Sequence, residues 1–128
     1  MKNATILTAL AAALGYGGWA VYANYDHGIH ASVVAGLIQG IYAFLSTFSI
    51  THVARKVYLK HNCKMRGIIV GFLMSFIIML AIPLTVHSIF GTPNMWKTIM
   101  PGLIWGSIYL AGFLILTEHK RLKDEKSM

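Results

Sequence analysis

The sequence predicts an all-α integral membrane protein, a small-residue-packed bundle of four transmembrane helices. Three observations support this prediction. Of the 128 residues, 56% are hydrophobic and only 12% are charged, and the mean hydropathy is +0.62. Four long stretches carry no charge at all, and Lys and Arg are unevenly shared among the segments between them. Soluble domains carry about twice this share of charged residues. A soluble globular domain, a disordered chain and a disulfide-rich scaffold are therefore excluded.

The uncharged stretches predict the number of spans. They cover residues 3–25, 27–54, 67–96 and 98–117. A helix rises about 1.5 Å per residue, so about 20 residues cross a hydrocarbon core of about 30 Å. Each stretch can cross once and is too short to cross twice. Trimming the polar ends places the helices near residues 4–24, 31–54, 67–89 and 98–117, within a single membrane domain over residues 1–128.

The Lys and Arg distribution predicts the orientation. Five of these residues lie in the loop over 55–66 and four in the tail over 118–128, whereas the other two loops hold only Lys97. Loops rich in Lys and Arg stay on the cytoplasmic side. We therefore expect a multi-pass protein of a bacterial-type inner (plasma) membrane, with both termini and the basic loop in the cytoplasm. The alternative, that the first span is a cleaved signal peptide, fits its length less well.

The net charge of +7 also bears on partners. Because the basic residues flank the predicted helices, they indicate contact with the bilayer and its anionic headgroups and not with nucleic acid. A cytoplasmic protein that docks on the basic loop is a further alternative.

Small residues at helical spacing predict close packing between helices. Such residues let two helices approach each other within a membrane, and Gly-x-x-x-Gly is the best-known form. The second span contains this spacing, and the third and fourth contain similar stripes. The predicted packing positions are Gly36, Gly40, Thr47, Gly71, Gly102 and Gly106. They indicate a compact bundle, a homo-oligomer or docking to another membrane protein.

Polar residues within the second span suggest a path through the bundle. An amide that faces lipid is costly, so Gln39 is expected to point inward. Ser46 lies on a neighbouring part of the helix surface, and His52 lies at its inner end. Gln39, Ser46 and His52 together form a candidate polar path.

A second candidate site lies at the predicted outer surface. Its members are one carboxylate, three imidazoles and one amine: Asp26, His27, His30, His87 and Lys97. Such a group can bind a transition metal, respond to pH or hold an anionic headgroup. The alternative is that polar residues simply gather where the chain meets water.

The absence of carboxylates within the predicted spans limits the range of possible functions. No Asp or Glu lies within a predicted span, although ion-coupled exporters usually need such a group, and no catalytic motif is found. We therefore expect a non-enzymatic protein without a cofactor. The first hypothesis is an accessory or assembly subunit of a membrane complex or a homo-oligomer. The alternative is a small carrier or flippase for a lipid-linked or anionic molecule, and a third, weaker idea is an outer-face metal or pH sensor.

Overall fold

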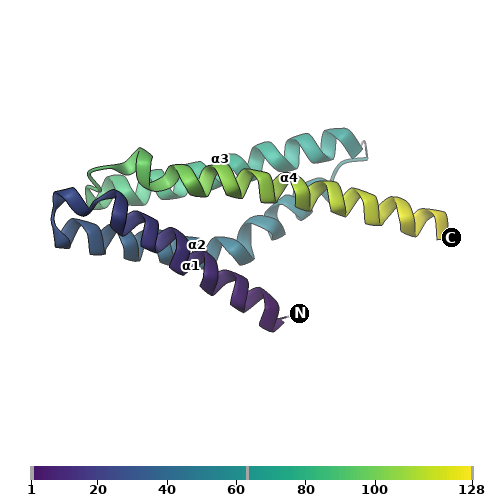
Figure 1. The fold of residues 1–128 in the computed structure, drawn as a ribbon. Helices are drawn as coiled ribbons and strands as arrows, with labels where there is room; N and C mark the ends of the chain where they lie inside the picture. The colour runs from purple at the N-terminus through teal and green to yellow at the C-terminus, as the bar shows by residue number, and fades with distance from the viewer. Residues whose placement is uncertain (1, 63, 128) are drawn as a thin grey trace.

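The computed structural model of the protein describes residues 2–62 and 64–127, and its regular elements over these residues are all helical (Figure 1). The elements are α1 (Lys2–Ala23), the short 3-10 helix η1 (Tyr25–His27), α2 (Ile29–Leu59), α3 (Lys64–Phe90) and α4 (Met95–Ser127). All four α-helices are long and apolar enough to cross a membrane. The prediction of an all-helical chain with four such helices is confirmed.

The helices extend beyond the predicted spans. α2 continues to Leu59 and α3 begins at Lys64, so the predicted loop over 55–66 shortens to residues 60–63, of which residue 63 is outside the described part of the chain. α4 continues through most of the predicted tail, as far as Ser127. The length of an uncharged stretch indicates how much of a helix can lie in lipid, but not where the helix itself ends. Lys, Arg and Glu are good helix formers, so a helix need not end where its charges begin.

The bundle has two distinct ends. Both termini and the connection between α2 and α3 lie at one end, called here the termini end; η1 and residues 91–94 lie at the other, the loop end (Figure 1). Gly28 and Gly91 turn the chain at the loop end with φ angles of 98° and 69°. Glycine is favoured at these two positions because other residues rarely adopt positive φ.

α1 and α2 cross at very close range through glycines. A Cβ atom on Gly17 would lie 3.0 Å from the carbonyl oxygen of Gly36 and 3.3 Å from the Cα atom of Gly40. A Cβ atom on Gly40 would lie 3.2 Å from the carbonyl oxygen of Ala13. The two backbones approach this closely because Gly17, Gly36 and Gly40 have no side chains to hold them apart.

α3 packs against α2 and α4 through one continuous stripe. Its buried residues recur at every fourth position: Gly67, Gly71, Ser75, Met79, Pro83 and His87. The main apolar cluster joins Met79 to five buried residues of α2 and α4, which are Ile50, Ala54, Tyr58, Leu110 and Leu114. This cluster holds α2, α3 and α4 together toward the termini end.

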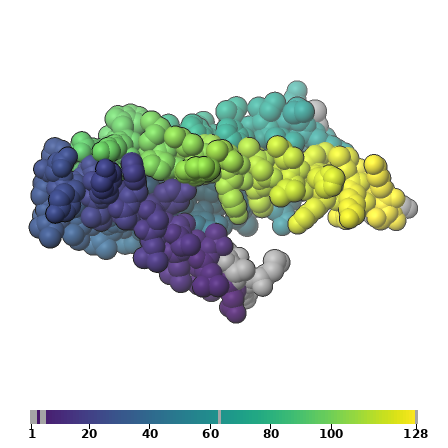
Figure 2. Space-filling view, viewed as in Figure 1, coloured from purple at the N-terminus to yellow at the C-terminus, as the bar shows by residue number. Residues whose placement is uncertain are grey.

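α1 is not part of that cluster and diverges from α4. The two helices lie close together near the loop end and separate toward the termini end (Figure 2). Along α1, Gly17, Ala20 and Ala23 are buried, whereas Ile6, Leu7 and Leu10 are exposed. The bundle is therefore closed at the loop end and open between α1 and α4.

Candidate functional site: a cavity between α1, α2 and α4

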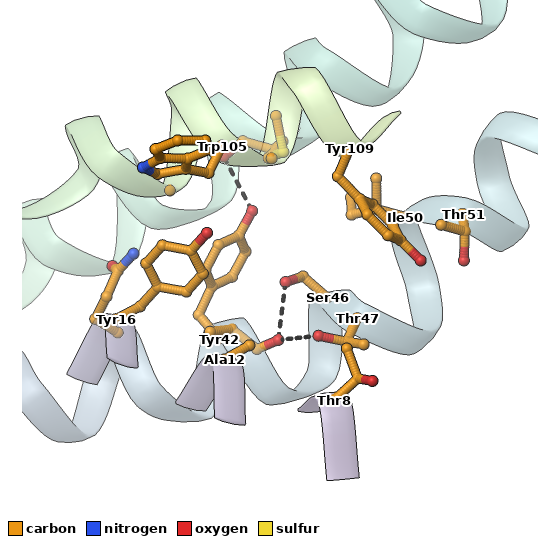
Figure 3. Close-up of a pocket in the computed structure, with 15 residues that line it drawn as sticks. Thr8, Ala12, Tyr16, Tyr42, Ser46, Thr47, Ile50, Thr51, Trp105 and Tyr109 are labelled. Carbon is orange, nitrogen blue, oxygen red and sulfur yellow. Dashed lines mark hydrogen bonds between the residues drawn. The ribbon is translucent and has the colours of Figure 1, made fainter. Parts of the chain in front are cut away.

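A cavity of about 320 Å³ lies where α1 and α4 diverge, with α2 as its base. The described residues of its wall are uncharged: most of the surface is apolar, and hydroxyl, amide and aromatic side chains are distributed over it. The polar and aromatic lining residues are Thr8, Tyr16, Gln39, Tyr42, Ser46, Thr47, Thr51, Trp105 and Tyr109. These side chains come from α1, α2 and α4 (Figure 3). Such a wall suits a neutral polar group better than an ion.

Helical spacing explains why these residues share one space. Thr8, Ala12 and Tyr16 recur every four residues on α1, and residues three or four apart lie on one helix face. On α4, Gly102 and Gly106 provide room, while the exposed side chains of Trp105 and Tyr109 form the rim. The cavity therefore results from the divergence of α1 together with the missing side chains on α4.

Three hydroxyl groups of the wall already donate their protons to backbone carbonyls. Tyr42 donates to Met79 at 3.0 Å, and Ser46 and Thr47 both donate to Ala43, at 3.2 and 2.8 Å (Figure 3). A hydroxyl oxygen that has donated its proton still carries lone pairs. These three groups can therefore accept hydrogen bonds from a molecule in the cavity.

Gln39 connects the cavity to the loop end through a buried chain of hydrogen bonds. Its Oε1 lies 2.8 Å from Nε2 of His87, and Nδ1 of the same ring lies 2.7 Å from Oγ1 of Thr92. Gln39 is 2% exposed and His87 is fully buried. This chain joins α2, α3 and the loop before α4.

A second buried group of polar side chains closes the loop end. Asn24 donates to the carbonyl oxygen of Ala20 and to the hydroxyl of Thr98, and its Oδ1 accepts from the backbone N–H of Asn94. Asn94 in turn donates to the carbonyl oxygen of Ala23 at 2.7 Å. The end of α1 is thus bonded to the start of α4, which gives the cavity a closed end.

An exposed aromatic contact reinforces this closure. Trp19 donates from Nε1 to the carbonyl oxygen of Lys97 at 2.7 Å. The Lys97 ammonium group lies 5.3 Å from the centre of the Tyr22 ring, within the range of a cation–π interaction.

At the termini end, polar contacts lie between α2 and α4. Tyr58 donates its hydroxyl proton to Glu118, and Arg121 donates to Tyr58 at 3.1 Å and to Glu118 at 2.8 Å. Lys64 of α3 lies 3.6 Å from Glu125. No residue of α1 takes part in these contacts as the structure describes them.

The five glycines among the predicted packing positions all face other helices of the same chain. Gly36 and Gly40 lie against α1, and Gly71 lies against α2 and α4. Gly102 faces Gln39, and Cβ on Gly106 would lie 2.8 Å from Sδ of Met79. The sixth position, Thr47, lines the cavity.

The structure divides the candidate polar path. Gln39 and Ser46 both line the cavity, whereas His52 is exposed and is not part of its wall. Thr51, the neighbour of His52, lines the cavity in its place.

The structure separates His87 from the other members of the candidate outer site by burial. Asp26, His27, His30 and Lys97 are exposed, whereas the imidazole of His87 is enclosed between Gln39 and Thr92. Within residues 2–62 and 64–127, no three His, Cys, Asp or Glu side chains are close enough together to hold a metal ion.

Several site residues escaped the sequence reasoning. Asn24, Asn94 and Thr98 were missed because single polar residues near helix ends resemble ordinary loop residues. The spacing of Thr8 and Tyr16 could have been noticed in the sequence, because residues eight apart lie on one face of a helix. The divergence of α1 from α4 has no such pattern in the sequence, because it depends on contacts between distant segments.

No family model matches the chain, and no curated protein or solved structure matches it either. The functional interpretation therefore comes from its own residues.

Proposed function

We propose that the protein is a non-enzymatic membrane carrier or flippase that holds the neutral polar group of an amphipathic, lipid-linked molecule in the cavity between α1, α2 and α4. The observation that carries this proposal is a cavity beside a gap between two helices, whose uncharged, mostly apolar wall contains several hydroxyl groups and one amide. A polar headgroup fits such a wall, and an apolar tail can leave through the gap into lipid.

The distribution of charge supports an orientation for this carrier. The exposed basic residues of the termini end include Arg55, Lys56, Lys60, Arg66 and Lys120. We place this end at the cytoplasmic surface of a bacterial-type inner membrane, against anionic headgroups. The loop end, closed by Asn24 and Asn94, then faces outward, and the arrangement corresponds to an inward-open state.

Filling the cavity tests this function. Ser46 is half-buried in the cavity wall, whereas Ser49 is exposed on the same helix outside it. We expect native mass spectrometry of the gently purified protein to detect a retained neutral amphiphile. Ser46→Phe should lose it and the matched control Ser49→Phe should keep it. Equal retention by both variants would contradict the proposal.

A second candidate, an assembly subunit of a membrane complex or a homo-oligomer, is favoured by a different surface. An apolar groove of about 580 Å³ runs between α1 and α2, lined by residues such as Leu14, Gly18, Val33 and Leu37. It lies on the far face of α1 from Tyr16, because two residues turn a helix through about 200°. A Cβ atom on Gly18 would meet nothing within 4 Å, so the groove floor is uncovered.

This candidate has its own variant. Gly18→Leu fills the groove without a clash inside the chain, so it should release a partner or a second copy and leave the monomer folded. Native gel electrophoresis of membranes solubilised in mild detergent measures this. Unchanged migration of an existing complex would contradict the assembly function and leave the carrier function standing.

A further inference from the structure

We propose that Gln39 selects the molecule in the cavity, because its amide nitrogen is held ready to donate a hydrogen bond to an acceptor oxygen such as an ester carbonyl. This inference rests on the proposed carrier function and defines its ligand more narrowly. The ligand class is a neutral amphiphile that combines hydroxyl groups with a carbonyl oxygen, as in an acyl ester of a polyol.

The nitrogen of the Gln39 amide group is unused. The side chain is 2% exposed and lines the cavity. Oε1 is bonded to His87, but Nε2 makes no hydrogen bond to any residue that the structure describes. Among the described residues, Ser75 Oγ is the one fully enclosed side-chain polar atom without a partner, so Nε2 of Gln39 is accessible from the cavity. A ligand oxygen there can accept a hydrogen bond from it.

The hydrogen-bond chain through His87 determines which atom of the Gln39 amide group faces the cavity. Oε1 of Gln39 can only accept a hydrogen bond, so Nε2 of His87 carries the proton of the neutral ring and donates it to Oε1. Nδ1 of the ring is then an acceptor, and the hydroxyl of Thr92 donates to it. The NH2 group of Gln39 is left for the cavity. His87 and Thr92 are therefore positioning residues for Gln39.

Gly102 leaves the amide nitrogen of Gln39 uncovered. A Cβ atom at Gly102 would lie 3.5 Å from Nε2 of Gln39, which is ordinary van der Waals contact. Glycine at this position keeps the donor open toward the cavity.

The hydroxyl groups of the wall complete the chemistry. Tyr42, Ser46 and Thr47 have donated their protons to the backbone and present acceptor oxygens. A ligand therefore needs hydroxyl donors for these three groups and one acceptor for Gln39. Hydroxyls beside a carbonyl meet both requirements.

Two probes that differ in one oxygen test the inference. 1-Monooleoylglycerol carries an ester carbonyl, and 1-O-oleylglycerol is the ether that lacks it. We expect the wild-type protein, offered both in non-ionic detergent, to bind the ester about three- to tenfold more tightly, as measured by native mass spectrometry. Gln39→Met should bind both probes equally.

If Gln39→Met does not fold, a smaller substitution next to Gln39 still tests the inference. Gly102→Ala covers the amide nitrogen with one methyl group, and Gly112→Ala adds the same methyl to the same helix where nothing lies within 4 Å. Gly102→Ala should lower the preference for the ester, and Gly112→Ala should keep it. Thr92→Val should lower the preference as well, since it frees the His87 ring.

The outcomes separate the two levels of the proposal. If the wild type binds both probes equally, or if Gly102→Ala retains the full preference, the role of Gln39 is overturned and the carrier function stands. If neither probe binds and Ser46→Phe changes no retained molecule, the proposed function fails and the inference fails with it.

Discussion

The loop end and the termini end of this bundle are held together by different means. At the loop end, the buried side chains of Asn24, Gln39 and His87 bond one helix to another or to a loop. At the termini end, an apolar cluster joins α2, α3 and α4, and a half-exposed ion pair between Lys64 and Glu125 joins α3 to α4; neither includes a residue of α1. α1 is thus anchored at one end and free of these contacts at the other.

This difference matters because the cavity lies between α1 and α4. A buried hydrogen-bond network imposes one geometry, since breaking it leaves polar groups without partners. Among the residues of the other half of α1 whose side chains the structure describes, Ala9 is buried and most of the rest are exposed, so we expect this half to change its distance from α4 at little cost. The asymmetry therefore allows the opening to vary while the closed end keeps its shape.

The largest expected effect comes from the α1–α2 crossing, which both ends require. Gly17→Leu places a side chain where even a Cβ atom would lie 3.0 Å from the backbone of Gly36. We expect a loss of about 3 kcal/mol or more, since neither backbone can move aside without breaking the crossing. Gly18→Leu, one residue along, is the matched control and should leave the melting midpoint of the monomer unchanged. Scanning fluorimetry of the detergent-solubilised protein measures both, and equal midpoints would contradict this crossing.

The second-largest expected effect distinguishes the contribution of the loop end to stability from that of the termini end. Asn24→Ala removes three hydrogen bonds at the loop end, so the hydroxyl of Thr98 and the backbone N–H of Asn94 lose their bonds to this side chain, while the bond from the Asn94 side chain to Ala23 remains. We expect a loss of about 2–3 kcal/mol of stability in the same assay. Asn62 is exposed at the termini end, and Asn62→Ala should have no measurable effect. A neutral Asn24→Ala would show that the loop end is not held by this network.

The helices themselves could be predicted, because lipid imposes a minimum length of uncharged sequence. The burial of Gln39 follows from the same physics, since an amide is costly in lipid. The residues that share a helix face could also be read from their spacing. Gly36 and Gly40 do lie on one face of α2, with Gly17 of α1 opposite them.

The spacing of residues along a helix does not reveal which segment packs against that face of the helix. The stripe of Gly36 and Gly40 was compatible with a partner chain, and the structure places α1 there. His87 was grouped with exposed residues because it ends a span, but the bend at Gly91 brings Thr92 back to its ring. Both outcomes depend on contacts between distant segments.

The smallest expected effect concerns the polar contacts of the termini end. Arg121→Ala removes the bonds from Arg121 to Glu118, Glu125 and Tyr58. Because these groups are partly exposed, water replaces much of what is lost, and salt weakens such pairs further. We expect a decrease in melting midpoint of no more than about a quarter of the Asn24→Ala decrease, and a smaller one still in high salt.

Lys126→Ala, at an exposed position near the end of the same helix, controls for the loss of one positive charge. If Arg121→Ala instead destabilises the protein as much as Asn24→Ala does, the ion pairs fix the termini end as firmly as the asparagine network fixes the loop end. In that case α2, α3 and α4 would form a rigid frame over their whole length. Any change in the width of the cavity would then have to come from α1 alone, pivoting about its bonds at Asn24.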